Sequence, residues 1–151
     1  MARIHKDLIP LVLWMGFIFI MSSDLGSYTH TLSLIESLMQ WLKFHLSAEA
    51  FGRVHFLLRK GGHLFEYAVL AMLILHSARL SMRPIVASWS WKVAAFSFLA
   101  ASAYAATDEL HQVFVPTRTA SLQDVLIDSG GALLGLSAAF LWRRCFPMRY
   151  H

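Results

Sequence analysis

Acidic, basic and imidazole side chains gather in two short stretches of a chain that is otherwise strongly apolar. The first stretch, RKGGHLFEY at residues 59–67, contains Lys60, His63, Glu66 and Tyr67. Spacings of three and four residues place His63, Glu66 and Tyr67 on one face of a helix. An ammonium, an imidazole and a carboxylate together suit phosphate binding or acid and base chemistry. Arg59 fits an ordinary charge flanking an apolar segment equally well.

The second stretch, DELHQVFVPTRTASLQDVLID, occupies residues 108–128. Asp108, His111 and Gln112 repeat the helical spacing of three and four, and Glu109 lies beside them. Ser121 and Asp124 resemble a capping box, with the serine as the N-cap and the acid at the third position.

Asp124 and Asp128 share a helical stripe with Gly131 and Gly135, so the acids are expected on the close-packed side. We expect Glu66 and Asp128 about a turn below the surface, where an unpaired charge costs on the order of 3 kcal/mol or more. These acids therefore require partners, and the nearby cationic groups are Lys60, His63, His111 and Arg118.

The elements that must position these residues are membrane helices. The chain has 151 residues, of which 57% are hydrophobic and 15% are charged, and its mean hydropathy is +0.54. A soluble domain of this length needs more polar residues to cover its surface. The sequence predicts a single all-α domain over residues 1–151, a bundle of four transmembrane helices. The predicted spans are residues 8–23, 64–80, 89–107 and 125–142.

The long connection over residues 24–62 carries its own helical pattern. Polar residues from Ser33 to Ser47 recur at steps of three and four, and apolar residues cover the remaining circumference. This pattern indicates an amphipathic helix in the membrane interface, although a helix packed against the bundle would have a similar sequence pattern. A second short helix is expected over residues 48–58.

Basic residues predict the topology. Lysine and arginine favour cytoplasmic loops, and eight of the thirteen lie in the two termini and the second connection, which predicts cytoplasmic termini. Because basic charge is explained by topology, no nucleic-acid partner is expected. All four helix ends that carry the polar residues then meet at the non-cytoplasmic face. The GxxxG spacing of Gly131 and Gly135 permits close helix packing, either inside the monomer or in a dimer.

At these residues the chain resembles the VanZ-like family of small membrane proteins. The resemblance rests on SSD (residues 22–24), RKGGHLFEYAVLA (59–71) and DELHQVFVPTRTASLQDVLIDSGGALLG (108–135). Thr117 departs from the pattern, because the family usually has glycine between the proline and Arg118. The resemblance implies a multi-pass protein of the bacterial cytoplasmic (inner) membrane, in a class named for an accessory glycopeptide-resistance factor. It supplies no reaction, so function has to be argued from the site.

Three functions fit this set of residues. The first is recognition of a phosphate-bearing membrane lipid or lipid-linked cell-envelope intermediate, with Lys60 and Arg118 holding the phosphate and a possible link to glycopeptide (teicoplanin-type) resistance. The second is a membrane hydrolase acting on a lipid headgroup, and the third is a salt-bridged scaffold for partner proteins. A proton-coupled transporter is weaker, because four short spans leave little room for alternating access.

Candidate residues follow from these hypotheses. The ligand-binding set is Lys60, His63, Glu66, Tyr67, Asp108, Glu109, His111, Gln112, Arg118, Ser121, Asp124 and Asp128. For the hydrolase, the catalytic candidates are Glu109, His111, Glu66 and Asp128, with Glu109 and His111 as one conceivable acid/base pair. No cofactor is required, although a divalent metal could be held by His63, Glu109, His111 and Asp128.

Overall fold

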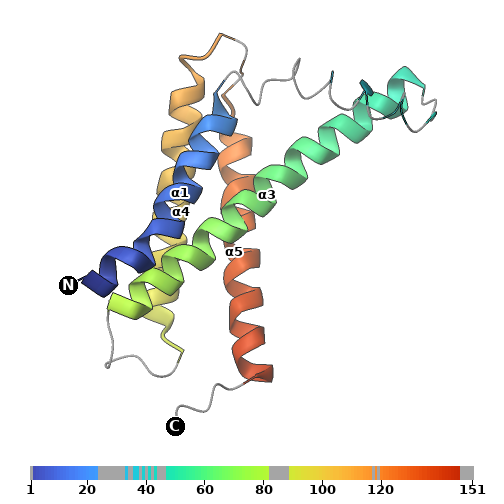
Figure 1. Ribbon diagram of the computed structural model, residues 1–151. Helices are drawn as coiled ribbons and strands as arrows, with labels where there is room; N and C mark the ends of the chain where they lie inside the picture. Colours follow the sequence, from blue (N-terminus) through green and yellow to red (C-terminus); the bar gives the residue numbers. More distant parts are fainter. Residues whose placement is uncertain are drawn as a thin grey trace.

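The computed structural model describes residues 2–23, 47–81, 89–116, 118 and 120–146, together with single positions between 33 and 43. Every regular element among these residues is a helix (Figure 1). The helices are α1 (Ala2–Ser22), α3 (Ala48–Ser81), α4 (Trp91–Gln112) and α5 (Leu122–Cys145). The interfacial helix predicted in the first connection lies outside the described residues except for these single positions.

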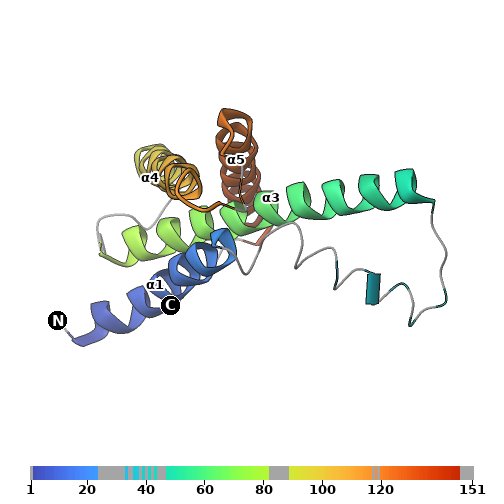
Figure 2. The same cartoon turned by 90° about the horizontal axis from the view of Figure 1, so that it is seen from above.

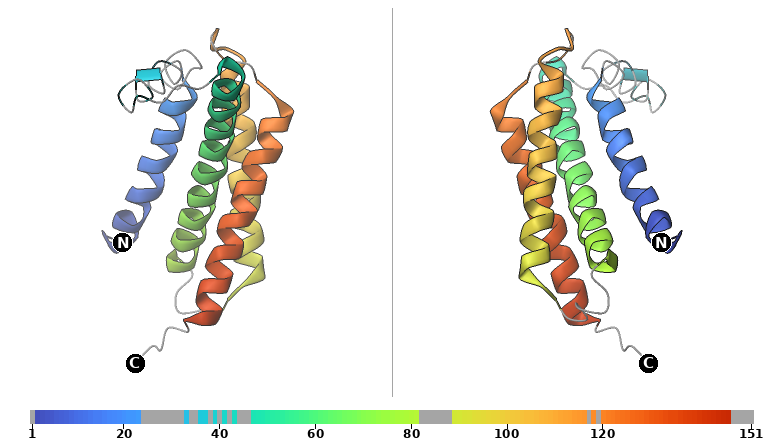
Figure 3. Two further views of the ribbon diagram at one scale, coloured as in Figure 1. Left: turned by 90° about the vertical axis from the view of Figure 1, so that its right-hand side faces the viewer. Right: turned by 90° about the vertical axis from the view of Figure 1, so that its left-hand side faces the viewer.

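Helix α3 is the centre of the arrangement. It packs most extensively against α5 and also contacts α4 and α1, whereas α1 makes only a small contact with α4. Seen from above, α3 runs between α1 on one side and α4 and α5 on the other (Figure 2). Successive helices run in opposite directions, so the start of α1 and the end of α5 lie at the same end of the bundle (Figure 3).

Helix α3 is one continuous helix of 34 residues, not the predicted short helix over 48–58 followed by a span over 64–80. Gly61 and Gly62 lie between the two predicted helices, but each interior glycine costs only about 1 kcal/mol relative to alanine. No proline interrupts the run, and strong helix formers flank both glycines. At 1.5 Å per residue, α3 is about 51 Å long, well beyond the ~30 Å hydrocarbon core of a bilayer. Its first turns therefore project past the bundle (Figures 1 and 2).

Helix α4 also runs beyond its predicted span, which ended at residue 107. Ser90 is its N-cap, and the Ser90 hydroxyl accepts a hydrogen bond from the Val93 amide at 3.4 Å. The last turn reaches Gln112, so the polar residues after residue 107 belong to a helix. Their helical spacing places Asp108 and Gln112 together on the inner side of that turn.

Close packing between α3 and α5 depends on two glycines. A methyl group at Gly131 would lie 2.9 Å from the Leu64 Cα, and one at Gly135 would lie 2.8 Å from the Ala68 Cα. Both glycines therefore pack inside the chain, against the backbone of α3. A dimer would have to use a different face, because α3 already covers this one.

The bundle has a narrow core and apolar outer surfaces. Tyr67, Leu70, Ala101, Ala105 and Ala132 are fully buried. Large apolar side chains remain exposed on the outer faces of the helices. Such exposure is unfavourable in water but favourable in lipid. The exposed side chains include Leu13, Phe96, Leu99, Leu126, Leu133 and Leu134.

Two helices, α3 and α5, are long and apolar enough to cross a membrane. The apolar part of α1, Leu8–Ser22, is shorter. The full set of four spans stays a prediction.

Candidate functional site

The polar residues meet where three helix termini surround the middle of α3. The end of α1, the end of α4 and the start of α5 converge on the α3 segment around residues 59–67. The predicted convergence of four helix ends is therefore confirmed for three of them, whereas α3 takes part through its middle and not through an end. The polar side chains that are almost completely buried here are Ser22, Asp108, Glu109, Gln112, Asp124 and Asp128.

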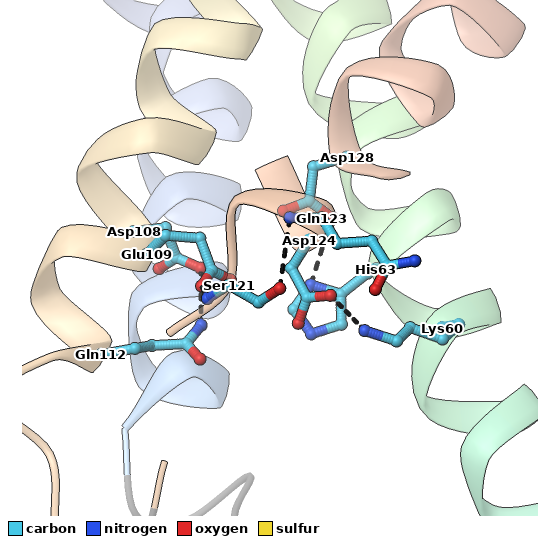
Figure 4. A network of polar contacts seen from close by, with 9 residues as sticks. All are labelled: Lys60, His63, Asp108, Glu109, Gln112, Ser121, Gln123, Asp124 and Asp128. Atoms are coloured by element: carbon cyan, nitrogen blue, oxygen red, sulfur yellow. Dashed lines mark hydrogen bonds and ion pairs between the residues drawn. The ribbon is translucent and has the colours of Figure 1, made fainter. Parts of the chain in front are cut away.

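Two contacts between basic and acidic side chains join α3 to α5 (Figure 4). Lys60 forms an ion pair with Asp124, whose side chain is only 4% exposed. His63 Nδ1 lies 3.2 Å from Asp128 Oδ1, at an angle outside the range of a well-formed hydrogen bond. Lys60 and His63 are one helical turn apart, as are Asp124 and Asp128, so the two contacts lie in register.

The start of α5 is capped by groups from two helices. The Ser121 hydroxyl accepts a hydrogen bond from the Gln123 amide at 3.2 Å, which confirms Ser121 as the N-cap. In a capping box, Asp124 would accept the Ser121 amide. Glu109 of α4 accepts that amide instead, at 2.8 Å. The predicted box is therefore wrong in its second half, and Asp124 is left to pair with Lys60.

Arg118 joins the loop before α5 to the end of α1. Its guanidinium donates to the carbonyl oxygen of Met21 and, at 3.2 and 3.3 Å, to that of Ser23. A cation in this position stabilises the unpaired carbonyls at a helix C-terminus. Burial lowers the pKa of Arg118, and the positive charge of Arg59 adds to that effect. The positive charges of these two guanidinium groups therefore disfavour each other.

A cavity of about 220 Å³ opens beside these groups. Its polar lining comes from α1, α3, α4 and the loop that carries Arg118. At roughly 30 Å³ per molecule of liquid water, the volume suits a compact headgroup, not a whole lipid. The residues lining it are Ile18, Met21, Ser22, Leu58, Arg59, Gly62, His63, Glu66, Asp108 and Arg118.

A family model described as VanZ/LLP1 matches residues 8–143, which include every residue of this cavity. The chain belongs to the VanZ/LLP1 family. Comparisons with curated proteins and with solved structures found no match. The VanZ/LLP1 assignment agrees with the resemblance seen in the sequence, and this family is one of membrane proteins.

In this VanZ/LLP1 protein, Arg59 is a cavity residue that the sequence interpretation left undecided. Its Nε atom is buried and has no hydrogen-bond partner among the residues that the structure describes. Arg59, His63 and Glu66 all line the cavity, at spacings of four and three residues. The helical period could therefore have identified Arg59, because it lies on the face of His63 and Glu66.

The structure separates some of the predicted residues from the cavity. His111 packs against Phe19 with ring centroids 4.5 Å apart, and it does not line the cavity. Glu109 and His111 are two residues apart on one helix, so they do not face each other and form no acid/base pair. Tyr67 is fully buried beside Tyr104, and its hydroxyl has no partner within the described part of the chain.

Metal binding has little support from the donor geometry. Over the described ranges, no three histidine, cysteine, aspartate or glutamate side chains are grouped so that they could hold a metal ion. Of the four predicted ligands, only His63 and Asp128 are shown in contact with each other.

Several buried acceptor atoms lack donors, on Asp108, which lines the cavity, and on Glu109 and Asp128, which are not among its lining residues. Gln112 donates to one oxygen of Asp108 at 3.3 Å, but the other Asp108 oxygen has no partner among the described residues, and neither has Glu109 Oε1 or Asp128 Oδ2. Buried polar atoms are almost always satisfied in native proteins. Water or the hydroxyl groups of a ligand can donate to these oxygens.

Proposed function

We propose that this protein recognises a phosphate-bearing membrane lipid, or a lipid-linked cell-envelope intermediate, through the cavity beside α3. The observation that carries the proposal is that Arg59 and Arg118, from two different elements, line one small cavity. A phosphate bound between them would relieve the repulsion between two neighbouring guanidinium groups. Arginine also offers a fork of N–H donors that matches phosphate oxygens.

We assign Lys60 a different role from the one expected for it. It was predicted to hold phosphate together with Arg118, but its ammonium group is paired with Asp124. Arg59 has no such acidic partner within the described residues. We therefore assign the phosphate to Arg59 and Arg118, and we assign Lys60 to the α3–α5 contact.

The other walls of the cavity suit the remaining parts of such a ligand. Glu66, Asp108 and His63 can accept or donate hydrogen bonds to the hydroxyl groups of a sugar or glycerol headgroup. Ile18, Met21 and Leu58 form an apolar wall, and Leu58 is also exposed on the outside of α3. A hydrocarbon chain attached to the phosphate can leave the cavity along this wall.

The proposal extends to the place and role of the protein in the cell. With both termini in the cytoplasm of a bacterium, the cavity opens at the non-cytoplasmic leaflet of the inner membrane, where lipid-linked wall precursors are used. Binding such a precursor would provide a physical route to glycopeptide (teicoplanin-type) resistance.

Mass spectrometry of lipids retained after gentle purification tests the proposal. We expect phosphate-bearing lipids on the wild-type protein and at least a tenfold loss on Arg59→Gln. The matched control is Arg53→Gln, because Arg53 also lies on α3 but is highly exposed and paired with Glu49. Equal lipid retention by Arg59→Gln and wild type would contradict the proposal and favour the scaffold function.

A further inference from the structure

His63 contacts an acid of α5 through one ring nitrogen and also lines the cavity. Asp128 lies 3.2 Å from Nδ1, while His63 itself lines the cavity that contains Arg59 and Arg118. An acid at Nδ1 orients the ring and stabilises its protonated form, which leaves Nε2 to exchange a proton. Catalytic contacts in a protein without substrate are often longer or less well aligned than in the reacting complex.

A proton donor lies one helical turn away. Glu66 lines the same cavity as His63, and no ion pair with a lysine or arginine is found for it in the described part of the chain. The acids of the site outnumber its lysine and arginine residues. In a buried site of that composition some carboxyl groups remain protonated, because burial and neighbouring acids both disfavour the charged form.

We propose that the cavity is an active site in which His63 and Glu66 hydrolyse a lipid phosphomonoester without a metal ion. This inference rests on the proposed lipid recognition and names its substrate class. A phosphomonoester carries about −1.5 to −2 charges at neutral pH. The two positive charges of the guanidinium groups balance this charge more closely than they balance the smaller charge of a phosphodiester.

The reaction balances with the groups present. His63 Nε2 removes a proton from water as the water oxygen attacks phosphorus, so a new P–O bond forms. The P–O bond to the lipid breaks, and the departing oxygen receives the proton of Glu66 to become a lipid alcohol. The imidazolium of His63 then returns its proton to Glu66. One water is consumed, one phosphate and one alcohol are released, and nothing is oxidised or reduced.

Each residue has a separate role in this step. Arg59 and Arg118 hold the equatorial phosphate oxygens and stabilise the charge that develops on them. Asp128 is a positioning residue, because it acts through His63. His63 and Glu66 are the catalytic residues.

Release of inorganic phosphate from phosphatidate in mixed micelles tests the inference on the full chain. We expect the wild type to release phosphate in the presence of EDTA. We expect His63→Asn and Glu66→Gln each to lower kcat by about 10²-fold or more, in the range that acid/base groups contribute. Asp128→Asn should lower kcat about tenfold with KM unchanged, which a merely structural role would not do. The control is His76→Asn, an exposed histidine on the same helix, which should keep the wild-type rate.

The outcomes separate this inference from the recognition on which it rests. His63→Asn that retains phosphatidate but releases no phosphate supports both. A wild type that retains phosphatidate without releasing phosphate overturns hydrolysis and leaves recognition standing, whereas a wild type that retains none overturns both. Activity lost in EDTA, or unchanged in His63→Asn, also overturns the inference. If His63→Asn does not fold, Glu66→Gln decides by the same criterion.

Discussion

At the scale of single residues, Glu109 determines what the acids of α5 can do. It accepts the amide of Ser121, the bond that a local capping box would have given to Asp124. Asp124 is thereby free for Lys60, and the start of α5 is tied to the end of α4. One hydrogen bond between helices therefore changes the role of two other side chains.

Removing the Glu109 carboxylate should destabilise the protein. Glu109→Ala leaves the part-buried Ser121 amide without its acceptor, and we expect the free energy of unfolding to fall by about 1 kcal/mol, the low end of the cost of an unsatisfied donor. Glu109→Gln keeps an acceptor oxygen and should lose less than half as much. Thermal unfolding in detergent measures both, with Glu49→Ala as a control at an exposed acid. Equal losses for Glu109→Ala and Glu109→Gln would contradict this account of the cap.

The Lys60 and Asp124 pair should contribute more to stability than the exposed pair on the same helix. Lys60→Met leaves the buried Asp124 carboxylate without its partner, and we expect the free energy of unfolding to fall by about 2–3 kcal/mol. This is less than the 3–5 kcal/mol that breaking a fully buried pair costs, because the Lys60 side chain remains 20% exposed. Adding Asp124→Leu should recover most of that loss.

Arg53→Met provides the comparison. It breaks the exposed pair with Glu49, where we expect at most about 0.5 kcal/mol. Chemical denaturation measures all three variants. No recovery in the Lys60 and Asp124 double variant would show that the two side chains do not act as a pair.

At the scale of elements, the sequence predicted the helices better than their ends. Hydropathy located the apolar centres, but α3 begins before its predicted span and α4 ends after its own. Hydropathy could not detect these extensions, because Arg59, Lys60, Asp108 and Glu109 resemble loop residues by polarity. Two of them, Lys60 and Glu109, have their polar partners, Asp124 and Ser121, at the start of another helix, which a hydropathy pattern cannot show.

The contact between α3 and α5 should depend on Gly131. Gly131→Ala places a methyl group against the backbone of Leu64, so the helices must separate, at about 1–3 kcal/mol for overpacking. Gly52→Ala is the matched control, because nothing lies within 4 Å of the added methyl group. Its higher helix propensity should leave stability unchanged or raise it by up to about 1 kcal/mol. The midpoint of thermal unfolding distinguishes the two, and equal shifts would refute the packing role.

At the scale of the whole molecule, the residue spacing identified most of the residues of the site but did not predict which of them contact each other. The three and four residue periods grouped His63, Glu66, Asp108 and Asp128, of which the structure buries Asp108 and Asp128 and leaves His63 and Glu66 partly exposed. They could not say that Arg118 binds the end of α1 or that Glu109 caps α5, because these contacts depend on how helices distant in sequence pack. Arg59 was left undecided because a flanking charge and a cavity residue look alike in sequence.

The alternating helices predict where the two ends of the molecule lie. Cys145 is the only cysteine and is exposed at the end of α5, at the end of the bundle away from the cavity. With cytoplasmic termini, a membrane-impermeant maleimide should label Cys145 only after permeabilisation. In a Cys145→Ser background, Gly52→Cys on the projecting part of α3 should be labelled in intact spheroplasts. The reverse pattern would show that the cavity faces the cytoplasm.

The most direct test of the central claim is an experimental density map of the Glu66→Gln variant prepared with phosphatidate, because this variant should bind the lipid and hydrolyse it only slowly. We predict density for a phosphate group within hydrogen-bond distance of the guanidinium groups of both Arg59 and Arg118, inside the cavity lined by His63 and Glu66. A map in which the phosphate binds elsewhere while Arg59 extends away from the cavity into solvent would contradict the account.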